Sequence, residues 1–397
     1  EIGYINSKLT KTEIVLHVIN DPFTLNIKKG GFKIGKMNFL IEGNYLSSKK
    51  DILDLKIKGN QIEISDIFSI LPIEYTNLSN QYISKGDLNF EGHLNGELNN
   101  NKRLNFSVNF NALNAYFKDK LNDIELNKVK LEGVFNNRKQ ELKIVNFSSL
   151  INEKILNGSF SISNFKEPIY FFSLNGLIDL NKNIFSNYLK NVSLEGETRF
   201  KIESKIITKK GNLLFEKING KLNSKKIVLD HKAKNTLLIL NNLDLNFSKK
   251  EIFLVTKESS FNKDDFDLKM SIKNWDKVIF SDSKELKIIY DLNINKFHLD
   301  DFIKLFSIED SSSKKYQFDF KGVFKAEELY YDTFKAYNVS AEEIIFNKSL
   351  IIKNLIMELL DGTASLNIYN SDLNTKKQTL VINGDLFRLN SKKLMKS

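Results

Sequence analysis

The sequence predicts a mostly β protein: an elongated, curved antiparallel sheet that forms an apolar groove from repeated units, with a few short helices. Two observations carry this prediction. Apolar and polar residues alternate along many segments, as in a strand with one wet and one apolar face. A unit made of a strand and a short capped helix also recurs along the chain. The composition agrees, because a chain with 41% hydrophobic residues, including 31 Phe, does not resemble a disordered one.

The alternation predicts individual strands. Its clearest apolar series are Leu104, Phe106, Val108, Phe110; Leu194, Phe200, Ile202; Leu243, Leu245, Phe247; Phe266, Leu268, Met270, Ile272; and Leu286, Ile288, Tyr290, Leu292, Ile294. Glycine-centred triplets recur between such series, in the rhythm of an antiparallel meander. We therefore expect turns at Gly59, Gly92, Gly96, Gly158 and Gly362.

The repeated unit occurs four times. Its copies span residues 58–68, 175–185, 294–303 and 383–394. In each copy an apolar strand end precedes a residue that can cap the first turn of a helix, namely Ser65, Asn181, Asp300 and Asn390. We expect a short helix after each of these residues, and we expect Pro72 to close the first helix.

Stacked β units of this kind build an elongated body rather than a globule. We divide the chain accordingly into residues 1–50, an incoming β segment of a truncated larger protein, and residues 51–397, the repeated β-groove region. Neither end resembles a natural terminus. The chain starts at Glu1 without a Met or a signal peptide and stops abruptly at Ser397, so we expect both ends to be cut from a longer protein.

The charge pattern indicates solvated strand faces. The net charge of +10 is spread along the chain, and Lys alternates with apolar residues, as in Leu55-Lys56-Ile57-Lys58. A nucleic-acid-binding protein usually concentrates its charge on one element, so we expect no nucleic-acid partner. Weak attraction toward anionic lipid headgroups is the alternative interpretation of the lysines.

Residue patterns for catalysis or metal binding are missing from the sequence. There is no Cys, and His17, His93, His231 and His298 are far apart, so we expect no thiol chemistry, metal site or cofactor. Asp300 and Asp301 begin a predicted helix, where carboxylates serve as caps. The Asp264, Asp265 and Asp267 cluster lacks the glycine and distal Glu of a calcium loop. Trp275 is expected to pack in a core or at a rim. We therefore expect a protein that is not an enzyme.

Several stretches resemble a known family. They are Leu104–Phe110, Leu113–Phe117, Leu126–Gly133, Ala326–Tyr331, Ala336–Ala341 and Leu359–Ser365. These β patterns resemble the AsmA family of lipid-transport and envelope-assembly proteins, in its Bacteroidota form, and the resemblance covers about residues 50 to 397. The family often has Gly-Gly where this chain has Asp361-Gly362, which is a mild departure.

The resemblance implies a function. AsmA-like proteins are similar to TamB and to the eukaryotic bridge-like lipid transfer proteins. They combine an N-terminal membrane anchor with a long periplasmic β-groove thought to carry phospholipid toward the outer membrane. For this chain the resemblance implies a periplasmic location, attachment to the inner membrane through an anchor outside the chain, and phospholipid or another acyl-chain lipid as partner. It brings no catalytic residue.

We therefore expect a non-enzymatic conduit for phospholipid between the inner and outer membranes. The residues expected to line the groove are Phe106, Val108, Phe110, Phe200, Ile202, Phe247, Leu268, Met270, Ile288, Tyr290, Phe318 and Phe320. Three alternatives remain. The same residues could form the core of a closed sandwich. The chain could be an assembly factor for outer-membrane proteins that contacts other envelope proteins through strand edges. It could also be a surface adhesin built as a β-solenoid.

Overall fold

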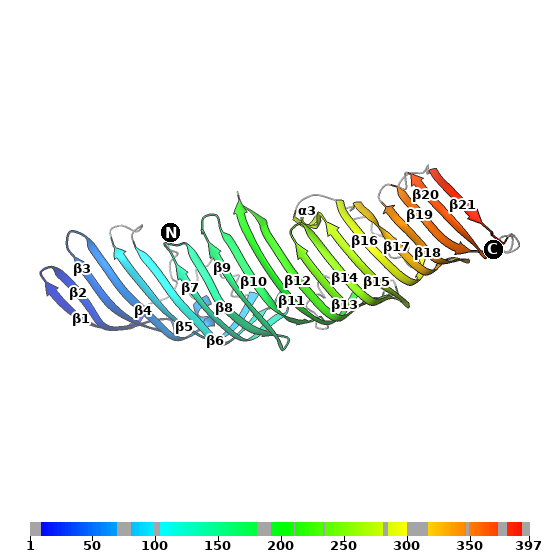
Figure 1. The fold of residues 1–397 in the computed structure, drawn as a ribbon. Coiled ribbons are helices and arrows are strands. Elements are labelled where there is room, and N and C mark those ends of the chain that lie inside the picture. Colours follow the sequence, from blue (N-terminus) through cyan, green and yellow to red (C-terminus); the bar gives the residue numbers. More distant parts are fainter. Residues whose placement is uncertain are drawn as a thin grey trace. The chain divides into compact units, whose positions relative to one another are not determined.

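The computed structural model is almost entirely β (Figure 1). It describes residues 9–69, 81–98, 104–180, 192–209, 211–232, 235–280, 285–299, 317–346, 349–371 and 379–390. Within these residues the chain forms 21 strands, assigned to one open sheet, and two short helices.

The strands and helices have the following bounds. They are β1 (Leu9–Asn20), β2 (Phe23–Ile34), β3 (Met37–Ser47), β4 (Asp51–Glu63), α1 (Ile64–Ser69), β5 (Tyr82–Glu97), β6 (Asn105–Asp119), β7 (Ile124–Asn136), β8 (Glu141–Ile151), β9 (Lys154–Ser163), β10 (Ile169–Asp179), β11 (Val192–Lys209), β12 (Asn212–His231), β13 (Thr236–Ser248), β14 (Glu251–Phe261), β15 (Asp264–Lys273), α3 (Trp275–Phe280), β16 (Glu285–His298), β17 (Gln317–Tyr331), β18 (Phe334–Phe346), β19 (Leu350–Leu359), β20 (Gly362–Ser371) and β21 (Thr379–Phe387).

The chain divides into two compact units. Unit 1 comprises Glu1–Ile178 and Lys201–Lys217, and unit 2 comprises Asp179–Phe200 and Ile218–Ser397. In unit 1, each strand from β1 to β10 pairs antiparallel with the next, as the alternation predicts. Pairing continues without interruption from β3 to β4, on either side of residue 50.

Unit 2 repeats this meander with one exception. Strands β12 to β16 pair antiparallel in order, and so do β17 to β21. Strands β16 and β17 are parallel, with Ile288 opposite Phe320 and Leu292 opposite Phe324. A parallel pair needs a crossover connection rather than a hairpin. Residues 299–316 are the connection here.

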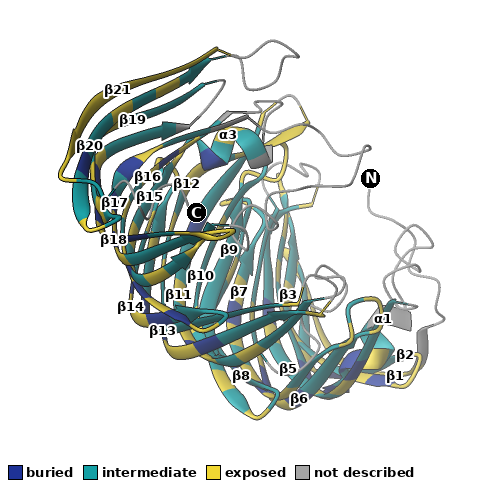
Figure 2. Ribbon diagram, turned by 90° about the vertical axis from the view of Figure 1, so that its right-hand side faces the viewer, coloured by how far each residue is buried: buried dark blue, intermediate teal, exposed yellow. Residues whose placement is uncertain are grey.

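Bulges within the strands bend the sheet. Seven non-glycine residues well inside strands have a left-handed backbone: Gln61, Asn114, Lys128, Asn242, Glu258, Asn338 and Asn354. Most of them coincide with register shifts, such as the shift between Gly59 and Ile62 on β4. A bulge adds one unpaired residue, bends its strand and increases the local twist. The sheet therefore curves along its strands within each unit (Figure 2).

The most buried residues lie beside these bulges and most of them are small. Ala112, Ala115 and Val129 in unit 1 and Thr256 and Ser259 in unit 2 are at most 1% exposed. Elsewhere most strand residues are half-buried or exposed (Figure 2). Small side chains are needed here because the bend brings neighbouring backbones and side chains close together.

The predicted fold class is confirmed: the protein is mostly β, and the sheet is curved and antiparallel apart from one pair. The strand of each predicted repeat is also present, as β4, β10, β16 and β21. Helix α1 follows β4, although it begins at Ile64, one residue before the predicted cap Ser65. The helices predicted after Asn181, Asp300 and Asn390, and Pro72, lie outside the described residues. Helix α3 was not predicted. Its first residue, Trp275, is buried, and its indole Nε1 donates to the Ser248 carbonyl at 2.8 Å.

Four of the five predicted glycine turns are wrong. Gly59, Gly92 and Gly158 lie inside β4, β5 and β9, and Gly96 lies near the end of β5. Only Gly362 directly follows a turn. At Gly59 the reason is steric, because a Cβ there would lie 2.4 Å from the Phe90 ring on the neighbouring strand. Such a glycine provides room for a side chain and does not reverse the chain.

Candidate functional site: the apolar face

In unit 1, one face of the sheet carries a row of apolar residues from strand to strand. Residues directly opposite each other in paired strands project to the same face. Through successive pairings the row contains Phe90, Phe110, Gly133, Ile144, Phe160 and Phe172. A second row on the same face contains Gly92, Val108, Phe135, Leu142, Ile162 and Tyr170. We call the face that carries these rows the apolar face, and the opposite one the polar face.

The apolar face is hollowed over β8 to β10. The hollow has a volume of ≈ 390 Å³ and is lined by Ile144, Phe147, Phe160, Phe172 and Leu174, together with Ser159. Since Ser159 alternates with Phe160, its hydroxyl belongs to the other face. All side chains that project into the hollow are therefore apolar.

Aromatic rings on the apolar face lie over glycines of neighbouring strands. A Cβ on Gly133 would lie 2.3 Å from Cζ of Phe110, and one on Gly220 would lie 2.1 Å from Cζ of Phe247. The ring can occupy this space only because glycine has no side chain. In each unit, therefore, these glycines give the rings room to lie against the neighbouring strand.

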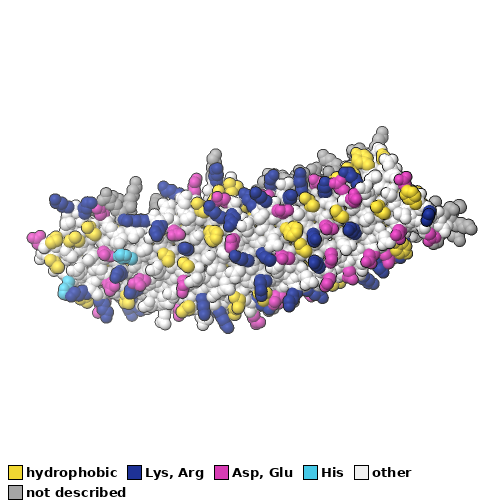
Figure 3. Space-filling model, viewed as in Figure 1, with side chains coloured by type: hydrophobic (Ala, Val, Ile, Leu, Met, Phe, Trp, Pro, Cys, Tyr) yellow, Lys and Arg dark blue, Asp and Glu magenta, His cyan; other side chains and the backbone are white. Residues whose placement is uncertain are grey.

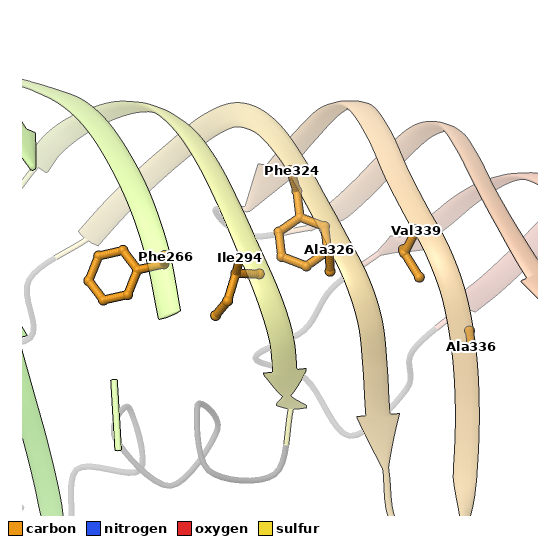
Figure 4. Close-up of a cluster of buried hydrophobic side chains, with 6 residues drawn as sticks. All are labelled: Phe266, Ile294, Phe324, Ala326, Ala336 and Val339. Atoms are coloured by element: carbon orange, nitrogen blue, oxygen red, sulfur yellow. The ribbon is translucent and has the colours of Figure 1, made fainter. Parts of the chain in front are cut away.

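Unit 2 has an equivalent apolar face on β15 to β17. Met270 lies opposite Tyr290, Leu268 opposite Leu292, and Ile288 opposite Phe320. Next to these rows lies a cluster of buried side chains, which Figure 4 shows side by side on neighbouring strands: Phe266, Ile294, Phe324, Ala326, Ala336 and Val339. Burial raises the pKa of the Tyr290 phenol to about 12, so this side chain is neutral near pH 7 and fits an apolar surface.

Within the residues that the structure describes, no second sheet covers the apolar face. Phe110, Phe160 and Phe172 in unit 1 are only half-buried, and so are Met270 and Phe320 in unit 2. The core of a sandwich would bury such residues between two sheets about 10 Å apart. Among the described residues, the largest side chains that are less than 2% exposed are those of Val129, Thr198, Thr256, Ser204 and Ser259, so no large apolar side chain of this face is fully buried. In the described part of the chain the side chains of this face are therefore partly exposed.

The twelve residues expected to line a groove fall into two groups, one in each unit. Unit 1 contains Phe106, Val108, Phe110 and Ile202. Unit 2 contains Phe200, Phe247, Leu268, Met270, Ile288, Tyr290, Phe318 and Phe320. Ile288 is buried, and the other described side chains are half-buried. Phe318, on β17, lies opposite Leu286 on β16. The side chain of Phe318 is not among the described ones.

The prediction did not include the residues that line the hollow. Ile144 and Phe147 are three positions apart because the β8–β9 register shifts between them, which interrupts the period of two. Strands β9 and β10 also have few charged residues, so their two faces contrast weakly in the sequence. The pairs Phe160 with Ile162 and Phe172 with Leu174 were the remaining signal.

Polar side chains do not assemble a catalytic or metal centre in the described part of the chain. His93 contacts Asp54 at 2.6 Å and His298 contacts Asp264 at 2.7 Å, each as an isolated pair. No group of three or more metal-ligating side chains occurs among the described residues. On the face shown in Figure 3, acidic and basic side chains are mixed rather than separated. No described helix has the length and hydropathy to span a membrane.

Comparisons with known proteins add no family assignment. No family model, no curated protein and no solved structure matches the chain.

Proposed function

We propose that this chain is a non-enzymatic lipid-handling protein of the bacterial periplasm. In this proposal the apolar face carries phospholipid acyl chains between the inner and outer membranes. An anchor outside this chain attaches the protein to the inner membrane. The resemblance of residues 50 to 397 to the AsmA family supports this location.

The observation that carries the proposal is the accessible apolar face with its hollow over β8 to β10. Water on such a surface is unfavourable by about 25 cal/mol per Å² of apolar area. An acyl chain lying there would gain about 0.8 kcal/mol for each methylene removed from water. It needs no specific polar partner, and the hollow offers none.

Photo-crosslinking at two adjacent residues tests the proposal. A photoreactive phenylalanine analogue replaces Phe172, on the apolar face, or Phe171, its neighbour on the polar face. The protein is expressed in a Gram-negative host, and adducts are identified by mass spectrometry. We expect lipid adducts at position 172 and few at position 171. Equal labelling at both positions, or none at position 172, would contradict a lipid-binding face.

A second function is favoured by the outermost strands. On β1, Ile14, Val15, Leu16, Val18 and Ile19 are between 43% and 55% exposed. On β21, Leu380, Ile382, Leu386 and Phe387 are between 52% and 60% exposed. An exposed apolar edge is a template for strand addition, the contact expected of an assembly factor for outer-membrane proteins. Protein adducts from position 19, without lipid adducts from position 172, would favour this function.

A further inference from the structure

The polar face also has a hollow, on the same strands β8 to β10. It has a volume of ≈ 540 Å³, within the range of about 300 to 1,000 Å³ usual for ligand sites. Its floor contains Ser148, Asn157, Ser159, Ser173 and Asn175. Strand pairing places Asn157 opposite both Ser148 and Asn175, and Ser159 opposite Ser173. These side chains therefore form a compact array of hydroxyls and amides.

On β9 and β10 this part of the polar face carries no charge, whereas β7 brings Lys130 and Glu132 into the lining of the hollow and Lys143 on β8 lies opposite Ser161. Strand β9 has no charged residue after Lys154, and β10 has none before Asp179. The rest of the chain is different, because 27% of all residues are charged. The following strand, β11, exposes Glu195, Glu197, Arg199 and Lys201. A solvated strand face in this protein normally uses Lys and Glu, so solubility alone does not explain the neutral array.

The array has unused hydrogen-bonding capacity. Within the described part of the chain, no side-chain hydrogen bond joins any of the five floor residues to another residue. Each amide offers two donors and an acceptor, and each hydroxyl offers a donor and an acceptor. Beside the array, Phe171 projects to the same face, opposite Ser161, with 37% of its surface exposed. The array of hydrogen-bonding groups thus has an accessible aromatic ring beside it on the same face, outside the lining of the hollow.

We propose that the polar face of β8 to β10 binds an uncharged oligosaccharide. Sugar hydroxyls both donate and accept hydrogen bonds, as the Asn and Ser side chains do, and a pyranose ring offers C–H groups to an aromatic face. A polyanionic glycan would find no positive side chain on β9 or β10 within the hollow, and Lys130, which lines the hollow opposite Ser148, is accompanied there by Glu132. Phe147 and Ser159 line both hollows, but Asn157 and Asn175, which we expect to bind the sugar, line only the one on the polar face.

Binding of defined neutral oligosaccharides tests this site. Cellohexaose, chitohexaose and maltohexaose are titrated into the whole chain by calorimetry, with oligogalacturonate as the acidic comparator. We expect at least one neutral hexasaccharide to bind and the acidic one not to bind. The double substitution Asn157→Ala with Asn175→Ala should weaken that binding at least tenfold, and Phe171→Ala should also weaken it.

The control is Asn109→Ala, which removes the same amide from the polar face of β6, outside the hollow. It should leave the affinity unchanged. Binding that survives the double substitution would mean that the sugar lies elsewhere, and failure of all three neutral hexasaccharides to bind would also overturn the proposal. Lipid crosslinking at position 172 should be the same in all these variants, so the two proposals can fail separately.

Discussion

At the scale of single residues, glycines on the apolar face differ in how much space they leave for a side chain. A Cβ on Gly133 would lie 2.3 Å from the Phe110 ring and 2.8 Å from the Lys143 carbonyl oxygen. Gly92 lies on β5, two strands from Gly133 on β7. A Cβ on Gly92 would have its nearest atom at 3.5 Å. Gly133→Ala should therefore lower the free energy of unfolding by about 1–3 kcal/mol, the usual effect of overpacking. Urea denaturation followed by circular dichroism measures this change.

Gly92→Ala is the matched control, since it places the same methyl group on the same face at an ordinary contact distance. It should change stability by less than about 0.5 kcal/mol. Equal losses in the two variants would mean that ring packing is not what requires glycine at position 133.

A second residue-scale prediction concerns Glu343, whose carboxylate contacts Lys321 and Lys353 on the two neighbouring strands. Hydrogen bonds from Lys321 and Lys353 lower the pKa of Glu343 from 4.5 to about 2. Because the folded pKa is depressed, this contribution to stability is present above pH 4.5 and is lost as the pH falls toward 2. Glu343→Gln should lower Tm slightly at pH 6, and the difference from the natural chain should shrink by pH 2. A pH-independent difference would exclude the ionic contribution.

At the scale of elements, the same kind of hydrogen bond occurs at three bulges. The left-handed residues Gln61, Glu258 and Asn354 donate their backbone N–H to a side-chain oxygen on the next strand. The acceptors are Asn89 at 2.9 Å, Asp267 at 2.7 Å and Asn367 at 3.0 Å. In all three cases the acceptor follows the residue opposite the position after the bulge. Some of the many Asn residues of the chain therefore have a structural role, as acceptors at bulges.

Asn89→Ala removes one of these acceptors. The Gln61 N–H then loses its partner, and stability should fall by about 0.5–1.5 kcal/mol. Asn89→Asp should restore most of that stability, because an Asp already accepts the corresponding bond at position 267. Thermal unfolding compares the variants. If both substitutions destabilise equally, the hydrogen bond to Gln61 is not the cause.

The sequence predicted strands well and bulges poorly. The series from Leu286 to Ile294 predicts β16 because one face contacts apolar neighbours and the other contacts water. The bulges were missed because residues such as Lys128 and Glu258 have no local preference for a left-handed backbone. Their backbone conformation is imposed by the packing of the strands. The parallel pairing of β16 with β17 was also missed, since alternation within a strand does not indicate the direction of the neighbouring strand. For the site, the alternation identified apolar residues on β6, β15 and β16, but the β8 bulge concealed Ile144 and Phe147.

At the scale of the whole molecule, the two outermost strands, β1 and β21, each pair with one other strand among the described residues. In the described residues β1 pairs only with β2, and Ile19 on β1 is 52% exposed. Ile19→Lys should reduce concentration-dependent self-association, because a charge on an edge strand opposes pairing with another strand. Leu40→Lys is the control, since Leu40 is 51% exposed but lies on β3, between two paired strands. Sedimentation velocity measures both variants, and equal effects would point to general charge repulsion.

Substitution of Val108 tests whether the apolar face is an open surface or half of a closed core. Val108 is half-buried between Gly92 and Phe135, and its neighbour Asn109 faces the polar side. On an accessible apolar face Val108→Asp can keep its carboxylate hydrated, so the chain should fold while copurified lipid and crosslinking at position 172 decrease. In a closed core the same carboxylate would be buried without a partner, which costs far more than a single domain can usually tolerate. Asn109→Asp adds the same charge to the polar face and should change neither folding nor lipid. Unfolding caused by Val108→Asp alone would mean that something covers the apolar face, and lipid could then not reach it along the strands.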